Sequence, residues 1–248
     1  MIQKANVLFS PVDGRLFFVI PLLGTTWIST TDTDFREDPG TVRADDEDIE
    51  YLLRSVEPFF PDVRRLALYS TSAGVRALVK QEGSESSVSR LHKVEETEPG
   101  VISVLGGKIT GYRAIAEDAA DAVCRLVGVG AKCSTAVRPF PGTGDAATVY
   151  GSRRAGVEAL VGEFGAVGAE AVFAAREEYC RHVDDYLFRR APHAFAADFG
   201  ASAAPEAMRA LSSELGWDSK RQDVEWSRVL AAAARASVKS YPGIVPSL

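Results

Sequence analysis

The residue pattern changes near the middle of this 248-residue chain, and that change limits the folds available to it. Up to Val127, short apolar runs alternate with turn-rich segments, which is typical of strands mixed with helices. A segment rich in glycine and proline follows, and beyond it the apolar residues recur at helical spacing. We therefore predict an α+β fold in three parts: a mixed or antiparallel sheet part over 1–127, a linker over 128–145 and a small all-helical domain over 146–248.

Individual elements of the first part can be predicted as well. The stretch RLFFVIPLLGTTWIST indicates a β-hairpin that turns near Gly24. The acidic residues 45–48 suit the first turn of a helix, where the helix dipole favours negative charge. The apolar run from Leu66 to Leu78 predicts a strand that is interrupted near Gly74.

The last third of the chain predicts three helices. The first spans Ala169 to Arg190, the second Pro205 to Leu215, and the third starts at Asp218, which suits an N-cap, and runs to Val238. The apolar residues expected on the inner face of the first helix are Val172, Phe173, Tyr179, Val183, Tyr186 and Leu187.

Charge and cysteine content exclude several classes of protein. The net charge of −6 argues against a nucleic-acid-binding surface. The three cysteines form no C-x-x-C motif and the three histidines no H-x-x-x-H pair, so neither a disulfide framework nor a metal site is predicted. The longest apolar run, Leu16 to Leu23, is too short to span a bilayer, and the N-terminal residues do not form a signal peptide. We expect a reducing compartment.

The stretch GGKITGYR, at residues 106–113, is the first candidate for a binding site. It follows a short β-branched run typical of a buried strand and precedes a helical pattern. Gly106 and Gly107 allow positive φ and let a ligand approach the backbone, while Thr110 suits the N-cap of the helix. A helix N-terminus attracts negative charge, and Lys108 adds a positive charge there. A plain strand–turn–helix corner with a solvated lysine is the simpler alternative.

Three cations lie beside predicted strands or turns, where a rigid sheet can direct them into a pocket. They are Arg76, Arg90 and Lys108. Each alone is typical of a surface charge, but together they are the residues needed to bind a small anion such as phosphate or carboxylate.

Several segments together carry a resemblance to a known family. They are DGRLFFVIPLLGTTWISTTDTDF, YLLRSVEPFFP, SAGVRALV, SVSRLHKV and VISVLGGKITGYRAIAEDAAD, followed by AREEYCRHVDDYLFRR and LGWDSKRQDVEW. In order and spacing they resemble the FAD-dependent glycerol-3-phosphate dehydrogenases, the last two segments resembling that family's C-terminal helical domain. The resemblance covers nearly the whole chain.

The resemblance implies a role for each candidate residue. The residues that would contact the flavin are Gly106, Gly107, Lys108, Ile109 and Thr110, and those that would contact the substrate are Arg76, Arg90 and Lys108. The enzyme would oxidise glycerol 3-phosphate to dihydroxyacetone phosphate, with hydride transfer to FAD and electrons passed to a quinone. A cytoplasmic location, peripheral on the inner membrane as in bacterial members, follows from the same resemblance, and homo-oligomerisation stays open.

Two parts of the family pattern are missing from this sequence. No strand–GxGxxG–helix unit is present, because the nearest pattern, at Gly142 and Gly144, follows Pro-Phe-Pro rather than a strand. The family's catalytic histidine lies upstream of the first residue, and His92, His182 and His193 do not match it, so no catalytic residue is identified here. Smaller departures are Ala77 in place of proline and Gly111 in place of threonine.

We therefore expect a chain that is incomplete and inactive alone. A truncated gene, a cut piece and a split enzyme with a separate N-terminal FAD-binding chain all remain open. The alternatives are a fragment of another flavoprotein, such as an amino-acid or hydroxy-acid oxidase, and a non-catalytic orphan module for binding or assembly.

Overall fold

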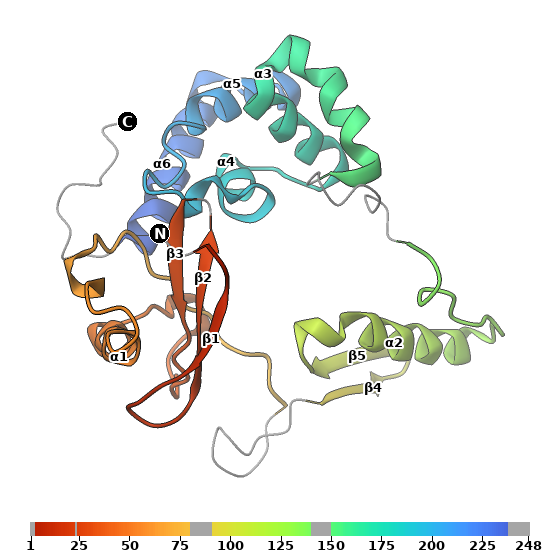
Figure 1. Ribbon diagram of the computed structural model, residues 1–248. Helices are drawn as coiled ribbons and strands as arrows, with labels where there is room; N and C mark the ends of the chain where they lie inside the picture. Colours follow the sequence, from red (N-terminus) through yellow and green to blue (C-terminus); the bar gives the residue numbers. More distant parts are fainter. Residues whose placement is uncertain (1–2, 23, 80–90, 140–149, 238–248) are drawn as a thin grey trace. The chain divides into compact units, whose positions relative to one another are not determined.

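The computed structural model describes residues 3–22, 24–79, 91–139 and 150–237 (Figure 1). The chain divides into two compact units. The first unit comprises Met1–Asp32, Arg43–Ala73 and Ala147–Leu248, and the second comprises Thr33–Val42 and Gly74–Ala146. The predicted boundaries at residues 127 and 146 differ from this grouping by contacts and stay a prediction.

The first unit begins with a three-stranded antiparallel sheet in the order β1 (Asn6–Phe9), β2 (Leu16–Leu22), β3 (Thr25–Ser29) (Figure 1). The pairing of β2 with β3 confirms the predicted hairpin, and Gly24 supplies the positive φ of 78° at its turn. One face of the sheet is covered, because Phe17 and Val19 are completely buried.

Helix α1 (Asp46–Val56) supplies the cover for that face through its buried Val56. The helix begins with a capping box, in which Asp45 accepts a hydrogen bond from the Asp48 N–H and Asp48 accepts one from the Asp45 N–H. The predicted acidic helix start is therefore confirmed. The hydroxyl groups of Ser10 and of Ser55, a residue of α1, share a buried hydrogen bond of 2.8 Å that ties the sheet to the helix.

The opposite face of the same sheet is apolar and exposed. Its side chains are between 37% and 68% exposed: Val7, Phe9, Leu16, Phe18 and Ile20. They form one surface because Val7 pairs with Phe18 and Phe9 with Leu16 across β1 and β2. An apolar surface of this kind on a sheet is typical of a face that another segment or protein covers.

The strand predicted between Leu66 and Leu78 is wrong. In the described part of this segment the one ladder contact is an isolated bridge between Ser70 and Ser237. Strand-forming residues become a strand only where a neighbour pairs with their backbone along several positions, and residues 71–79 belong to no strand in the structure.

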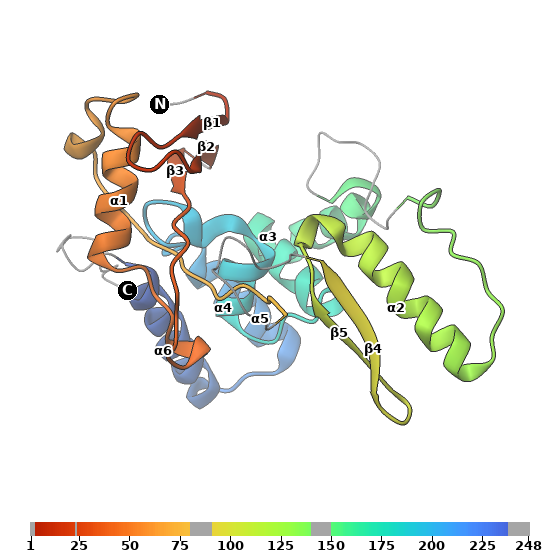
Figure 2. The same ribbon diagram turned by 90° about the horizontal axis from the view of Figure 1, so that it is seen from below.

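The second unit contains a β-hairpin and one helix, which lie side by side in both views (Figure 1 and Figure 2). The hairpin joins β4 (His92–Glu98) to β5 (Val101–Gly106), and the helix is α2 (Tyr112–Val127). The strand and helix predicted around the glycine corner are thus confirmed. The strand is not buried, however, because β5 has no second neighbour in the described residues and Val101 and Val104 are 49% and 45% exposed.

The linker predicted over 128–145 is described only as far as residue 139. Helix α2 ends at Gly128, which takes the left-handed conformation common at helix C-termini, and residues 129–139 contain turns without helix or strand. The glycine pattern at Gly142 and Gly144 lies outside the described residues.

The remaining part of the first unit is helical (Figure 1). Its elements are α3 (Arg154–Glu177), α4 (Val183–Asp185), a π-helical turn (Tyr186–Arg190), α5 (Ala204–Leu215) and α6 (Ser219–Ala236). Pro205 in the first turn of α5 and the N-cap Asp218 of α6 confirm two predicted helix starts. The final predicted residue, Val238, lies outside the described part.

The single helix predicted over Ala169 to Arg190 is wrong. Helix α3 ends at Glu177, and Tyr179 takes a positive φ of 58° with its side chain 78% exposed. The chain then turns back, so that Val183, Tyr186 and Leu187 are completely buried in the same core as α5. The tertiary core decides this break, since an unbroken helix would direct these residues along the axis of α3 instead of back against α5.

Candidate functional site

The glycine corner between β5 and α2 has the backbone that its sequence requires. Gly106 and Gly107 both have positive φ, of 71° and 90°, which confirms the predicted conformation. Lys108 is extended, with φ −115° and ψ 143°, and a 3-10 turn, Ile109–Gly111, leads into α2.

The space beside each glycine is filled by the unit itself. A Cβ atom on Gly106 would lie 2.9 Å from Val79 Cγ2, and one on Gly107 would lie 2.7 Å from Ile115 Cδ1 and 3.1 Å from His92 Cβ. Real Cβ atoms essentially never show contacts below 3.0 Å, so the neighbouring side chain would have to shift. Internal packing therefore accounts for both glycines, whatever else approaches the corner from its exposed side.

The start of α2 leaves its N–H groups without a side-chain cap. The predicted N-cap, Thr110, is wrong, because the additional 3-10 turn moves the helix start to Tyr112 and places Gly111 at the cap. Gly111 has no side chain, and the first turn of α2 contains no acidic residue. The positive end of the helix dipole is consequently uncompensated, in a turn where Lys108, Ile109 and Thr110 are all exposed.

The structure describes two of the three candidate cations, Lys108 and Arg76. The Lys108 ammonium makes no hydrogen bond or ion pair with the side chains that the structure describes. Arg76 is exposed in an irregular segment, and the same segment reaches the corner three residues later, where Val79 packs against Gly106. Arg90 lies outside the described residues.

A histidine–aspartate pair beside the corner was missed in the sequence. His92 Nε2 lies 2.6 Å from Asp118 Oδ2, and both line a hollow of about 270 Å³ together with Val94, Asp121 and Arg125. The residues of the pair lie 26 positions apart, on a strand and on a helix, so no local spacing predicts them. They are partly open to solvent, His92 at 24% and Asp118 at 58% of the side chain.

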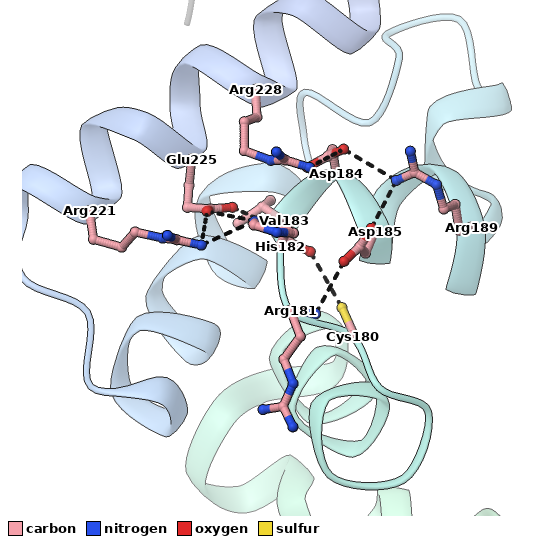
Figure 3. A network of polar contacts seen from close by, with 10 residues as sticks. All are labelled: Cys180, Arg181, His182, Val183, Asp184, Asp185, Arg189, Arg221, Glu225 and Arg228. Atoms are coloured by element: carbon pink, nitrogen blue, oxygen red, sulfur yellow. Dashed lines mark hydrogen bonds and ion pairs between the residues drawn. The ribbon is translucent and has the colours of Figure 1, made fainter. Parts of the chain in front are cut away.

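The helical part of the first unit contains a second polar cluster, centred on the completely buried Glu225 (Figure 3). Its Oε1 lies 2.8 Å from an Arg221 nitrogen and 2.9 Å from His182 Nδ1. Its Oε2 accepts a hydrogen bond of 3.1 Å from the Val183 N–H. Glu225 thereby joins α6 to the first residues of α4, and both carboxylate oxygens are bonded.

Asp184 forms a matching arrangement on the other side of α4 (Figure 3). It accepts hydrogen bonds from Arg228, at 2.8 Å, and from Arg189, at 3.2 Å. Burial raises the pKa of the Asp184 carboxyl, but the hydrogen bonds from the two arginines outweigh burial, and the pKa lies below its ordinary value.

The spacing of this cluster is compatible with a metal ion, but its charge balance is not. One ligand atom each from His182, Asp184 and Glu225 lies within 4.8 Å of the others. Each carboxylate is already compensated by at least one guanidinium, which leaves no net negative charge to attract a divalent cation. We interpret the cluster as the polar connection between α4, the π-helical turn and α6.

Comparison with known proteins shows which domain and which relatives the chain resembles. Residues 144–222 match the C-terminal domain of alpha-glycerophosphate oxidase. The aerobic glycerol-3-phosphate dehydrogenase of Bacillus subtilis (strain 168) is 37% identical over 147 residues, which are 56% of this chain and 26% of that protein. The mitochondrial glycerol-3-phosphate dehydrogenase SDP6 of Arabidopsis thaliana is 29% identical over 265 residues, covering 86% of this chain and 42% of that protein.

A solved structure supports the same comparison at the level of the fold. The glycerol-3-phosphate dehydrogenase from Bacillus halodurans, solved in complex with FAD, matches with a TM-score of 0.78 and 23% identity over 94% of this chain and 54% of that one. The predicted fold, a sheet part followed by a C-terminal helical domain, is confirmed. The chain spans about half or less of the length of these relatives, and it is similar to the C-terminal portion of the glycerol-3-phosphate dehydrogenases.

Proposed function

We propose that this chain supplies the substrate-binding and C-terminal helical part of an FAD-dependent glycerol-3-phosphate dehydrogenase. The observation that carries the proposal is the glycine corner: an uncapped helix start beside an exposed lysine, in a chain similar to such dehydrogenases. When bound, FAD would accept hydride from the carbinol carbon of glycerol 3-phosphate, and dihydroxyacetone phosphate would be the product.

The residues at the corner fit the flavin end of FAD. The positive end of the α2 dipole favours negative charge, which develops at the pyrimidine end of a flavin on reduction. Ile109 is 86% exposed and Thr110 is exposed, so a planar group can reach this turn. In this proposal Gly106, Gly107, Lys108, Ile109 and Thr110 contact the flavin.

Substrate binding would depend on the three candidate cations. A phosphate group takes paired hydrogen bonds from guanidinium groups and a point charge from an ammonium. We assign these roles to Arg76, Arg90 and Lys108, with Lys108 placed where substrate and flavin meet. The match of residues 144–222 to an alpha-glycerophosphate oxidase domain supports a glycerol-phosphate substrate over the amino acids or hydroxy acids of other flavoprotein oxidases.

The nucleotide-binding half of the enzyme would come from outside these residues, as a separate N-terminal chain or a preceding segment. Two observations support a partner that covers these surfaces. Apolar side chains on β1 and β2 are exposed, and no described residue of the second unit is buried. We propose that the chain alone holds no FAD and is inactive, because the pyrophosphate contacts would be lost.

The cellular setting belongs to the same proposal. We propose a quinone as electron acceptor and a cytoplasmic location with peripheral attachment to the inner membrane, and a homo-oligomer is compatible with both. None of the described helices combines the length and apolar character needed to cross a bilayer.

The test is a lysine substitution in an assembled enzyme, made by combining this chain with the N-terminal half of a relative. A charged hydrogen bond lost from a desolvated pocket costs about 1.5–3 kcal/mol, so Lys108→Met should lower kcat/KM for glycerol 3-phosphate about tenfold to a hundredfold at matched flavin content. The control is Lys132→Met, which changes another exposed lysine of the second unit and should leave kcat/KM unchanged.

Two outcomes contradict the proposal. If Lys108→Met changes kcat/KM by less than about twofold, Lys108 is not a substrate residue. If this chain alone, after dialysis against excess FAD, keeps a stoichiometric flavin band in its visible spectrum, the missing half is not needed to bind the cofactor.

A further inference from the structure

The His92 side chain connects the two elements that meet at the glycine corner. His92 is the register partner of Gly106 across the β4–β5 hairpin, and its Cβ would lie 3.1 Å from a Cβ on Gly107. Its imidazole extends to α2, where Nε2 lies 2.6 Å from Asp118 Oδ2. One residue therefore packs on both glycines and also bonds to the helix that follows them.

Two of the contacts that hold α2 at this end lie one turn apart. Ile115 packs its Cδ1 atom against Gly107, and Asp118, three residues later on the same face, bonds to His92. No described residue of the second unit is buried, so no larger core sets the angle between α2 and the hairpin. Loss of either contact would let the start of α2 move relative to Gly106 and Gly107.

The hollow beside His92 is lined mainly by polar side chains of α2. Asp118, Asp121 and Arg125 line it together with Val94, which lies on the same strand as His92. Among these described residues Asp118 bonds to the imidazole, whereas Asp121 does not.

We propose that His92 is a positioning residue, whose bond to Asp118 holds the start of α2 against Gly106 and Gly107. The part of this proposal that concerns the flavin rests on the proposed function. The part that concerns the backbone of the corner does not, and the two parts can be tested separately.

The first test measures hydrogen exchange by mass spectrometry on the full chain, in peptides covering residues 104–116. Asp118→Ala removes the bond to His92 and should exchange at least about tenfold faster than the unmodified chain in this segment, a change of about 1.4 kcal/mol in opening free energy.

The matched control is Asp121→Ala, which removes a carboxylate from the same hollow but leaves the bond to His92 in place. Its exchange should stay within about twofold of the unmodified chain. Equal behaviour of the two aspartate variants, or unchanged exchange in Asp118→Ala, overturns the proposal. Peptides of α6 report whether a variant has unfolded generally.

The second test uses the assembled enzyme and His92→Asn. Positioning predicts a fall in kcat of about tenfold with KM for glycerol 3-phosphate within about threefold, and a shifted flavin absorption band. An unchanged kcat and band overturn the positioning of the flavin contact. If the unmodified assembly binds no flavin, the proposed function fails, while the exchange measurement still decides the role of His92.

Discussion

The helical part of the first unit and the described part of the second unit differ in how far they bury their side chains. The helical part buries a continuous core that includes Tyr186, Leu187 and Leu211, and its two buried carboxylates are fully bonded. The second unit buries none of its described residues, and its hairpin leaves Val101, Val104 and Leu105 at least 40% exposed. The comparison indicates that the helical part has a core of its own, whereas the described residues of the second unit have none.

The N-terminal sheet stands between these extremes. Its α1 side buries Phe17 and Val19, while the other side exposes five apolar side chains. The exposed side and the second unit are the regions where we expect another segment or protein to pack, since apolar surface that folding leaves uncovered gains stability only on association.

Limited proteolysis of the chain alone gives the largest expected difference between the regions. Cleavage should occur first within residues 91–139, because backbone with few buried contacts opens at low cost. A fragment that contains α3, α5 and α6 should survive, and mass spectrometry identifies it. A surviving fragment that contains α2 but not α5 and α6 would contradict the comparison.

The substitution Glu225→Ala tests the polar connection of the helical part. Removal of this carboxylate leaves the buried Val183 N–H without its hydrogen-bond partner and the 40% exposed Arg221 without its ion pair, so we expect a loss of about 1–3 kcal/mol in the free energy of unfolding. Urea denaturation followed by circular dichroism measures it. Glu214→Ala removes a pair with Arg176 at the surface and should cost less than about 1 kcal/mol. Similar losses in both variants would show that burial of Glu225 has no special weight.

Two glycines of the second unit separate backbone strain from packing. Gly107→Ala and Gly128→Ala both place a side chain at positive φ, which costs about 1–2 kcal/mol for residues other than glycine. A Cβ on Gly107 also meets Ile115, whereas one on Gly128 meets nothing within 4 Å. Gly107→Ala should therefore cost at least about 1 kcal/mol more, measured by hydrogen exchange of α2. Equal costs would mean that Ile115 moves aside freely.

The helical part should lose stability in acid through Asp184. The pKa of this carboxyl is lowered in the folded state, so its stabilisation is present above the unfolded pKa of about 4 and is lost as the pH falls toward the folded pKa. The free energy of unfolding should drop by about 1–3 kcal/mol between about pH 5 and about pH 2, and less in Asp184→Asn. Urea midpoints of both proteins across this range measure the difference, and parallel curves would remove Asp184 as the cause.

Local features of the chain were predictable from the sequence because their causes are local. The hairpin at Gly24, the acidic start of α1, the N-cap Asp218 and the left-handed glycines at 106 and 107 each depend on a few neighbouring residues. The resemblance to glycerol-3-phosphate dehydrogenases also came from short segments in a fixed order, and the relatives confirm it.

The errors share a different origin. The segment Leu66–Leu78, expected as a strand, forms only an isolated bridge in its described part, and the helix expected through Tyr179 breaks where the core draws Val183 inward. The Thr110 cap was displaced by a 3-10 turn. In each case the local sequence allowed the predicted element, but a distant contact or the geometry of the turn determined the structure that forms.

The sequence by itself determined which residues can turn, cap and alternate, because backbone sterics and side-chain size act over a few positions. Only the tertiary structure decided that His92 meets Asp118 and that Glu225 meets His182, across 26 and 43 positions. It also decided that the space beside Gly106 and Gly107 belongs to Val79 and Ile115. The physical reason is that such pairs depend on how whole elements pack, and packing is set by the summed burial of many side chains, which no short stretch contains.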